Sequence, residues 1–500
     1  MKKIKKVLIV NRSEIALRIM ATAHALGIKT VAIYAEQDQF LSYIYKANEA
    51  YKLSGTGASA YLDQIEILEI ARKAGADAIH PGYGFLAENA EFAQAVIDAG
   101  FIWIGPTPKN IATLADKVEA RKIMHQAGVP TIPGFEFDAS DSKSFLLAEK
   151  KALVINYPVI LKCAHGGGGK AMRLVKSKQD FSTAWNLVVS EAKRFFNSSL
   201  ILIEKQIENP RHIEIQIAGD GETFIHLHER ECSIQRRHQK IIEEAPCNFI
   251  SKETKRKLYE AALRATRSVS YQNIGTVEFL VAPDESIYFL EINTRLQVEH
   301  SVTEMTTGID LVALQFQLAG KKKLSLTQNK VMQRGHAIEC RIYAENPKQN
   351  FAPSTGTISH LTIPSGPFLR VDHDLEEGME VSPFFDPMLT KFTTYGERRG
   401  DAIGRMKEAL ENTQLYGIKT NISFLLNILR SALFKTGEFH TQLLDNKDDL
   451  KNLLNMSKDQ EFLFLESEVK ELVKILLEKN SPKSQTKTSS PSRWRTQQWR

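Results

Sequence analysis

The chain has 500 residues, of which 43% are hydrophobic and 25% charged, an ordinary composition for a globular protein of about three domains. The formal net charge is +6, but five basic residues and no acid lie after residue 480, so the body is nearly neutral and a nucleic-acid-binding face is not indicated. No stretch approaches the ~18 apolar residues of a membrane span, and the apolar run near the N-terminus is too short for a signal peptide.

The four cysteines lie far apart, at Cys163, Cys232, Cys247 and Cys340. None belongs to a CxxC pair, so the sequence predicts neither a zinc site nor a disulfide framework. This pattern is typical of a reducing compartment, and we expect a cytoplasmic location.

The N-terminal part alternates between short apolar runs and helical patterns. Strands are predicted at residues 7–10, 30–34, 77–79 and 101–104, and a helix at about residues 88–99. This β-α alternation predicts a doubly wound parallel sheet. The first strand leads into Asn-Arg-Ser-Glu and not GxGxxG, so the layout is Rossmann-like without a dinucleotide fingerprint.

The middle of the chain is predicted to contain a small module followed by a β-rich region. A helix is expected at residues 117–126. Residues 134–205 form the module, with strands at 158–162 and 200–204 around a glycine-rich turn and a helix. Residues 211–293 show a largely alternating pattern that predicts β-structure.

The C-terminal part begins near Gly335 with short strands, Pro/Gly turns and a helix at about residues 401–411. Apolar residues at helical spacing in residues 461–480 predict an amphipathic helix that packs on the body or on a partner. The tail after residue 480 is rich in Ser, Thr, Lys and Arg, which is typical of disorder.

A glycine-rich loop follows the strand at residues 158–162 and consists of Gly166, Gly167, Gly168 and Gly169. Glycines let backbone N–H groups approach an anion without obstruction by a Cβ, so the loop is suited to cradle phosphate. A flexible hinge is the alternative, but the flanking Lys162 and Lys170 favour phosphate. The loop is not a Walker A motif, because GxxxxGK[ST] is absent.

Two further charged segments have both a structural and a functional interpretation. Glu204 and Lys205 end an apolar strand, which is either an ordinary buried strand or an edge that reads the adenine ring. Residues 229–240 are dense in hydrogen-bond donors. Such a run is usually a solvated surface, but its interleaved glutamines and arginines suit a site for several anions.

The strongest signal is a set of polar residues at alternating positions. Glu291 and Asn293 lie two residues apart at the end of a predicted strand, so both should point to one face. With Glu278 on the neighbouring strand they offer the hard oxygen ligands that magnesium prefers. Arg295, Gln297 and Glu299 are expected to continue the alternation and to bind a second small substrate.

In this order, these segments resemble the biotin carboxylase family, the ATP-grasp component of biotin-dependent carboxylases. The resemblance covers roughly residues 4–445. It also rests on residues 11–12, 80–85, 116–117, 208–216, 335–341 and 417–421.

The resemblance implies a multidomain α/β and α+β chain with the ATP-grasp fold. It divides the chain into a Rossmann-like domain (1–115), an ATP-grasp domain (116–332) with a mobile lid (about 134–205), a β-rich biotin carboxylase C-terminal domain (333–447), a helical extension (448–480) and a disordered basic tail (481–500).

The resemblance also implies roles for individual residues. ATP would be bound by Lys117, Lys162, the glycine loop, Glu204, Lys205, Ile207, His212, Gln235 and His238. Magnesium or manganese would be held by Glu278, Glu291 and Asn293. Bicarbonate would be bound by Lys240, Arg295, Gln297 and the backbone of Val298. Glu299 would be the general base, and Arg341, with Tyr83 and His238 nearby, would stabilise the enolate of biotin.

The implied reaction proceeds through carboxyphosphate, which releases CO₂ and a phosphate that deprotonates biotin. Lysines, arginine and metal supply the positioning and charge neutralisation that phosphoryl transfer needs. A biotin-attachment Met-Lys-Met is not found, since Met406-Lys-Glu lies in a helical pattern. We therefore expect a separate biotin carboxyl carrier protein, a carboxyltransferase and a homodimer. The final acceptor stays open among acetyl-CoA, another acyl-CoA and pyruvate.

Two alternatives remain: another ATP-grasp ligase that activates a different carboxylate, and a catalytically dead scaffold. The segment 235–240 and Arg341 disfavour the first. The second is motivated by departures from the family pattern, where Ser13, His165 and Ala171 replace glycines and Ser301 replaces proline. Ala21 and Ala25 also stand on the first helix where family dimers carry charges, but the retained site residues disfavour a scaffold.

Overall fold

The computed structural model describes residues 3–164, 171–320 and 323–456. The glycine loop at residues 166–169, the predicted helix at 461–480 and the basic tail lie outside the described residues. None of the described helices is long and apolar enough to cross a membrane.

The N-terminal part is a five-stranded parallel sheet with strand order β3-β2-β1-β4-β5, which confirms the predicted doubly wound layout. Its strands are β1 (Lys6–Ile9), β2 (Lys29–Tyr34), β3 (Glu49–Lys52), β4 (Ala78–His80) and β5 (Ile102–Trp103). Its helices are α1 (Ser13–Ala25), α2 (Ser42–Lys46), α3 (Gly57–Ala60), α4 (Gln64–Lys73), α5 (Ala90–Asp98) and α6 (Pro108–Ala115). The turn after β1 and the segment after β4 both face the site described below.

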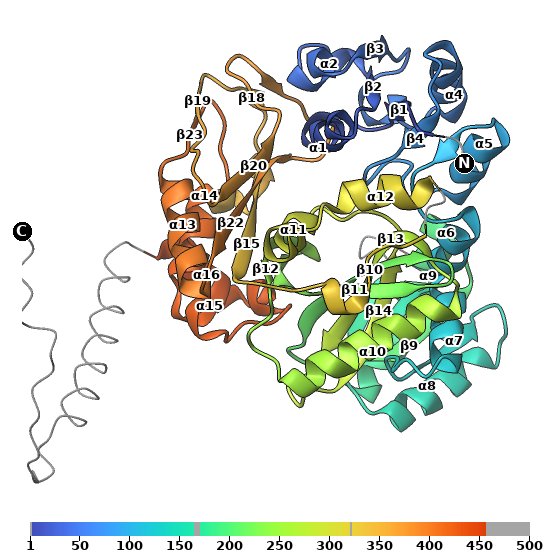
Figure 1. Ribbon diagram of the computed structural model, residues 1–500. Coiled ribbons are helices and arrows are strands. Elements are labelled where there is room, and N and C mark those ends of the chain that lie inside the picture. The colour runs from blue at the N-terminus through green and yellow to red at the C-terminus, as the bar shows by residue number, and fades with distance from the viewer. Residues whose placement is uncertain (1–2, 165–170, 321–322, 457–500) are drawn as a thin grey trace, which may run out of the picture.

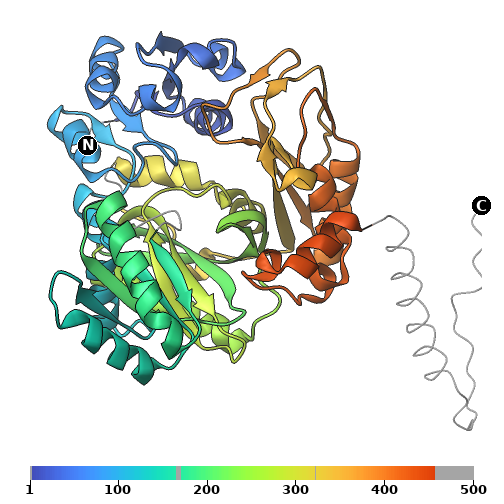
Figure 2. The ribbon, with the colours of Figure 1, turned by 180° about the vertical axis from the view of Figure 1, so that it is seen from behind.

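Helix α7 (Lys117–Gln126) leads into the lid segment and begins at the predicted residue. The Asp116 side chain accepts hydrogen bonds from the Val118 and Glu119 backbone N–H groups and so caps the helix, as expected for an aspartate N-cap. The lid is an antiparallel sheet of order β6-β9-β7-β8, covered by two helices and lying at the lower edge of the molecule (Figures 1 and 2). It contains β6 (Gly134–Asp138), α8 (Ser144–Ile155), β7 (Val159–Cys163), β8 (Met172–Val175), α9 (Lys178–Phe196) and β9 (Leu200–Lys205).

One eight-stranded sheet joins the middle of the chain to its C-terminal part, in the order β14-β13-β10-β11-β12-β15-β22-β20 (Figure 1). Its strands are β10 (Arg211–Asp220), β11 (Phe224–Arg236), β12 (Gln239–Ala245), β13 (Gln272–Val281), β14 (Ile287–Asn293), β15 (His336–Tyr343), β20 (Leu369–His373) and β22 (Met388–Gly396). Strands from both sides of the predicted boundary near residue 332 thus share one sheet. Functional groups far apart in the sequence are brought onto it side by side.

The prediction of largely alternating β-structure over residues 211–293 missed helix α10 (Lys252–Ser268). Its small apolar residues pack on the Ile213, Ile215 and Ile217 face of β10. The opposite face of β10, with His212 and Glu214, is also buried and lines the site. The side chains of β10 therefore alternate between two faces as predicted, but the polar face is buried in the interior and does not face solvent.

A second expectation was wrong: Arg295, Gln297 and Glu299 do not continue a strand. Strand β14 ends at Asn293, an irregular turn follows, and Glu299 occupies the N-cap position of α11 (His300–Thr307). The next helix, α12 (Leu311–Ala319), packs beside β13. Because a strand cannot bend back on itself within a few residues, the side chains of residues 295–299 are aimed by individual contacts and not by a pleat.

The C-terminal part covers the end of the large sheet with α13 (Arg399–Glu411), α14 (Ile422–Arg430), α15 (Ala432–Thr436) and α16 (Lys447–Asn455). Short strand pairs are β16 (Glu345–Asn346) with β17 (Ala352–Pro353), β18 (Gly356–Thr357) with β21 (Glu380–Val381), and β19 (His360–Thr362) with β23 (Gln414–Tyr416). After β23, a turn at Gly417 delivers Asn421. The Asn421 amide donates to the Arg341 carbonyl and accepts from the Tyr343 N–H.

We predict opposite effects for two Gly-to-Ala changes in this region. Gly417 has φ +99° and a Cβ there would lie 2.0 Å from the Thr357 carbonyl oxygen, so Gly417→Ala should lower the free energy of unfolding by about 3 kcal/mol or more. Gly404 is exposed within α13 and has open space around it, so Gly404→Ala should raise it by up to about 1 kcal/mol. Urea denaturation of both variants measures this, and equal effects would contradict the role of the turn.

Candidate active site

Every predicted site residue that the structure describes lines one cavity of about 1860 Å³. The cavity lies where the N-terminal sheet, the lid and the large sheet meet. The residues brought together are Tyr83, Lys117, Lys162, Glu204, Lys205, Ile207, His212, Gln235, His238, Lys240, Glu278, Glu291, Asn293, Arg295, Gln297, Val298, Glu299 and Arg341.

Lys240 is the electrostatic centre of the cavity. Its Nζ lies 2.5 Å from Glu214 Oε2, 2.8 Å from Glu278 Oε1 and 2.6 Å from Glu299 Oε1. Burial alone would lower the pKa of Lys240, but these three carboxylates raise it well above its usual value. The lysine is therefore charged, and it keeps three buried glutamates from repelling one another.

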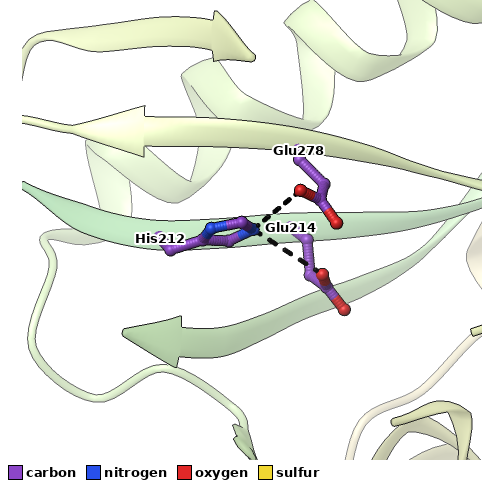
Figure 3. A group of neighbouring side chains, drawn as sticks. All are labelled: His212, Glu214 and Glu278. Carbon is purple, nitrogen blue, oxygen red and sulfur yellow. Dashed lines mark ion pairs between the residues drawn. The ribbon is translucent and has the colours of Figure 1, made fainter. Parts of the chain in front are cut away.

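His212 and Glu214 on β10 and Glu278 on β13 form a compact group, with His212 Nε2 3.1 Å from Glu278 Oε2 and 3.9 Å from Glu214 Oε2 (Figure 3). The three side chains have ligand atoms within 4.8 Å of one another, as a metal site would. However, the Lys240 ammonium already bridges both carboxylates, so we interpret this group as a charge-balanced scaffold.

Arg230 on β11 lies beneath Lys240 and is fully buried. Its guanidinium pairs with Glu214 and donates to Gln216, Thr276, Thr303 and Gln297. The contact to Gln297 Oε1, at 2.7 Å, leaves the Gln297 amide nitrogen to donate to Glu278 Oε1 at 2.8 Å. Arg230 thereby fixes the orientation of Gln297 towards the cavity.

Glu299 is held by cations on both of its oxygens. Lys240 contacts Oε1, and Arg341 on β15 donates to Oε2 at 2.8 Å. Burial alone would raise the pKa of Glu299, but Lys240, Arg341 and Arg230 lower it well below its usual value. Arg341 also pairs with Glu243 on β12, and burial raises the pKa of Glu243 to about 8.

The oxygen-rich end of the cavity fits a magnesium ion. Glu278 and Glu291 are directly opposite on neighbouring strands, so their side chains lie on one face. Burial and the nearby charge of Glu278 raise the pKa of Glu291, although Lys117 and Lys240 act to lower it. Asn293 Oδ1 lies near them and accepts from Arg295 at 3.1 Å. These oxygens are the ligands that a divalent ion prefers.

The lid side of the cavity carries the other predicted ligands. Lys162 Nζ lies 2.6 Å from Glu204 Oε2, and Lys205 donates to the carbonyls of Asn156 and Tyr157. Gln235 contacts His212 Nδ1 at 3.0 Å. Glu204 thereby holds the Lys162 ammonium on β7, the strand that precedes the glycine loop in the sequence.

Some structural partners of the site were missed from the sequence. Glu214 and Arg230 were not assigned roles, although His212, Glu214 and Gln216 share the spacing of one strand face. Glu88, from the segment after β4, contacts Arg295 Nε at 2.9 Å. Such contacts between distant segments leave no local pattern, so no sequence signal could have indicated Glu88.

The departures at Ser13 and Ala171 fall where the backbone has positive φ, +53° and +50°. Glycine adopts such positive φ values without strain, so both positions are suited to the glycine of the family pattern. Ser301, in contrast, has a clear structural partner, because its hydroxyl donates to the Glu339 carboxylate and contacts Thr393 Oγ1 at 2.7 Å. His165 lies outside the described residues.

Removing the Arg230 charge should be strongly destabilising. Arg230→Met leaves Glu214 buried beside unsatisfied polar groups, which typically costs about 3–5 kcal/mol, and the urea midpoint should fall accordingly. Arg256 is more than half exposed and pairs with Glu253 and Glu260 on α10, so the control Arg256→Met should change the free energy of unfolding by under about 1 kcal/mol. Similar losses in both variants would refute this assignment.

Comparison with known proteins agrees with this geometry. Three family models match: the biotin carboxylase N-terminal domain at residues 3–111, the ATP binding domain of the carbamoyl-phosphate synthase L chain at 116–327, and the biotin carboxylase C-terminal domain at 339–446.

Similar proteins are found among both sequences and solved structures. The biotin carboxylase of Halalkalibacterium halodurans is 45% identical over 88% of this chain and 97% of its own. The alpha subunit of Arabidopsis thaliana methylcrotonoyl-CoA carboxylase is 45% identical over 89% of this chain, but the chain spans only 61% of that subunit. The biotin carboxylase domain dimer of Hydrogenobacter thermophilus 2-oxoglutarate carboxylase, solved with MgADP, ADP and bicarbonate, has a TM-score of 0.86 and 39% identity, covering 92% of this chain and 100% of that one. The chain therefore belongs to the biotin carboxylase family, as an ATP-dependent ligase of the ATP-grasp fold that carboxylates biotin with bicarbonate.

Proposed function

We propose that this chain catalyses the first half-reaction of a multisubunit carboxylase, with biotin presented by a separate biotin carboxyl carrier protein. The observation that carries the proposal is the triad of Lys240, Glu299 and Arg341, which places a carboxylate between two cations beside the magnesium-type ligands. This arrangement suits a small anion that must be deprotonated and then phosphorylated.

We assign each residue a role by its place in the cavity. ATP is bound by Lys117, Lys162, Glu204, Lys205, Ile207, His212, Gln235, His238 and the glycine loop. Glu278, Glu291 and Asn293 would hold Mg²⁺ or Mn²⁺, which supplies charge neutralisation for phosphate oxygens when bound. Bicarbonate is bound by Lys240, Arg295, Gln297 and the Val298 N–H. Biotin is contacted by Arg341 and Tyr83.

The basicity of Glu299 depends on the substrate. With Lys240 and Arg341 on its oxygens, the carboxylate is ionised but a weak base. Bicarbonate shares Lys240 with Glu299, and a cation that is shared with a second anion stabilises the Glu299 charge less. The pKa of Glu299 therefore rises on binding, towards the value that proton abstraction needs.

The proposed reaction has three steps. Glu299 takes the bicarbonate proton, and a bicarbonate oxygen attacks the γ-phosphorus of ATP, releasing ADP and forming carboxyphosphate. Carboxyphosphate breaks its C–O bond to give CO₂ and phosphate. Phosphate removes the proton from biotin N1, Arg341 stabilises the enolate oxygen, and N1 attacks CO₂ to give carboxybiotin. Closure of the lid would keep the intermediate from water.

We predict that Glu299→Gln lowers bicarbonate-dependent, biotin-stimulated ATP hydrolysis by about 100-fold or more, the usual contribution of a general base. The Kd of ADP should stay within about twofold, because Glu299 lies at the bicarbonate end of the cavity. The control is Glu380→Gln on exposed β21, which should retain full activity. Turnover that persists in Glu299→Gln would refute the assigned base, and wild-type ATP hydrolysis without biotin stimulation would favour another ATP-grasp ligase.

A biotin carboxyl carrier protein, a carboxyltransferase and a final carboxyl acceptor are inferred from the family, and for this chain they remain proposals. The relatives are named for different acceptors, so acetyl-CoA, another acyl-CoA and a 2-oxo acid such as pyruvate all remain candidates. Four buried thiols without disulfide bonds support a reducing compartment such as the cytoplasm.

We also propose a homodimer through the edge formed by α1 and β20, which contact each other. Leu26 is 50% exposed at the end of α1, and Phe368 is 44% exposed before β20. The solved Hydrogenobacter relative is a dimer, and an exposed apolar side chain such as Leu26 would be covered if this edge forms the contact.

Leu26→Asp should raise the dimer Kd by about tenfold or more, since a charge is then buried against an apolar partner. Sedimentation velocity over a concentration series measures it. Leu187→Asp is the control, because Leu187 is equally exposed (47%) but lies on the lid helix α9. A wild-type chain that stays monomeric at micromolar concentration would contradict the dimer.

A further inference from the structure

The turn of residues 297–299 has supports on the side away from the cavity. Lys391 on β22 is fully buried, and its ammonium donates to the Val298 carbonyl oxygen. His300 Nδ1 lies 2.8 Å from the Gln297 carbonyl oxygen. Two successive peptide groups are therefore held through their carbonyls.

The direction of these contacts determines where the Val298 N–H points. Burial and the nearby Lys391 lower the pKa of His300 well below its usual value, so the ring is neutral and its Nδ1 must carry the proton that Gln297 accepts. In a trans peptide the C=O and N–H groups point in opposite directions. Because the Gln297 carbonyl faces His300, the Val298 N–H of the same peptide points away from His300, and Val298 itself lines the cavity.

The strand register couples this support to Arg341. Arg341 on β15 and Lys391 on β22 are directly opposite each other, so their side chains lie on one face of the sheet. Arg341 contacts the Glu299 carboxylate at 2.8 Å while Lys391 contacts the preceding residue's carbonyl. One cross-strand pair thus holds both the side chain and the backbone of the turn.

Two carboxylates lie beside the Lys391 ammonium. Its Nζ lies 3.9 Å from Glu339 and 3.8 Å from Asp372. Burial raises the pKa of the nearby Glu14 on α1 to about 8, although Lys391 acts to lower it. Ser301 donates to Glu339, and Thr393 does so at 3.3 Å. Burial raises the pKa of Glu339, while Lys391, Arg341 and the Ser301 hydrogen bond act to lower it. Ser301 belongs to the helix that follows the turn.

We propose that Lys391 is a positioning residue of the bicarbonate site. It holds the Val298–Glu299 peptide, while His300 holds the preceding peptide, which carries the Val298 N–H, and together they direct this N–H and the Glu299 carboxylate to the substrate. Ser301 tethers Glu339, which lies beside Lys391. This role rests on the proposed function of the cavity. Lys391 itself does not line the cavity, so it acts through the turn.

A purely structural role predicts a different result from a positioning role. A buried cation that only stabilises the sheet would lower stability when removed, without a selective effect on one substrate. A positioning residue changes the KM for bicarbonate more than the KM for ATP, because the nucleotide ligands lie on other elements. Steady-state kinetics of the full-length chain with free biotin, varying one substrate at a time, separates the two.

Lys391→Met retains the length of the side chain and removes the ammonium. We expect the KM for bicarbonate to rise about tenfold or more, as small misplacements of a substrate do, with the KM for ATP within about twofold. Ser301→Ala should shift the bicarbonate KM in the same direction by a smaller factor. The control is Arg430→Met, which removes another buried cation of the C-terminal part, paired with Glu411, and should leave both KM values unchanged.

Equal changes in the two KM values, or a Lys391→Met enzyme that differs from wild type only in stability as Arg430→Met does, would overturn the proposal while the proposed function stands. If Lys391→Met does not fold, Ser301→Ala decides, and an unchanged bicarbonate KM then overturns it. A wild-type chain without biotin-stimulated turnover would instead remove the proposed function, and this role with it.

Discussion

Three buried glutamates share one lysine at the centre of this molecule, and much of the surrounding structure follows from that balance. Removing Glu214, Glu278 and Glu299 from water is costly unless a cation neutralises them. Lys240 supplies one charge, and Arg230 and Arg341 supply two more from the neighbouring strands. The site is thus preorganised for anions: substrates meet cations that are already oriented, and little reorganisation is needed when charge develops on a phosphoryl group.

This balance requires a continuous sheet across the middle and C-terminal parts. Glu278 and Glu214 are carried by β13 and β10, Lys240 by β12, and Arg341 by β15, and all four strands belong to one eight-stranded sheet. A hinge between β12 and β15 would separate Arg341 from Glu299 and leave a buried carboxylate partly uncompensated. The module of residues 134–205 has its own small sheet and core, so the pairing of these charges does not depend on its packing.

The sequence was informative where function depends on local pattern. The parallel N-terminal sheet, the helix at residues 117–126 and the placement of Glu278 on the strand beside Glu291 were all predicted from local patterns. It failed where geometry depends on contacts between distant segments. The turn of residues 295–299 has the same two-residue spacing as a strand, and only Lys240, Arg341 and Lys391, which are remote in sequence, show that a bent segment is held there. Helix α10 was missed because its small apolar residues lie among many charges.

The departures from the family pattern show what such a site tolerates. Ser13 and Ala171 adopt positive φ without being glycine, which costs roughly 1–2 kcal/mol each, yet neither change removes a charged group from the cavity. Ala171 still accepts the hydrogen bond from the Cys163 N–H beside β7 and β8, so the strain is borne by an intact hairpin. Ser301 introduces a hydroxyl into a buried layer, where an unpaired polar group would be costly, and Glu339 and Thr393 satisfy it. The substitutions at Ser13, Ala171 and Ser301 therefore alter backbone strain and supporting contacts, while the described carboxylates and cations that would carry the chemistry stay paired and oriented.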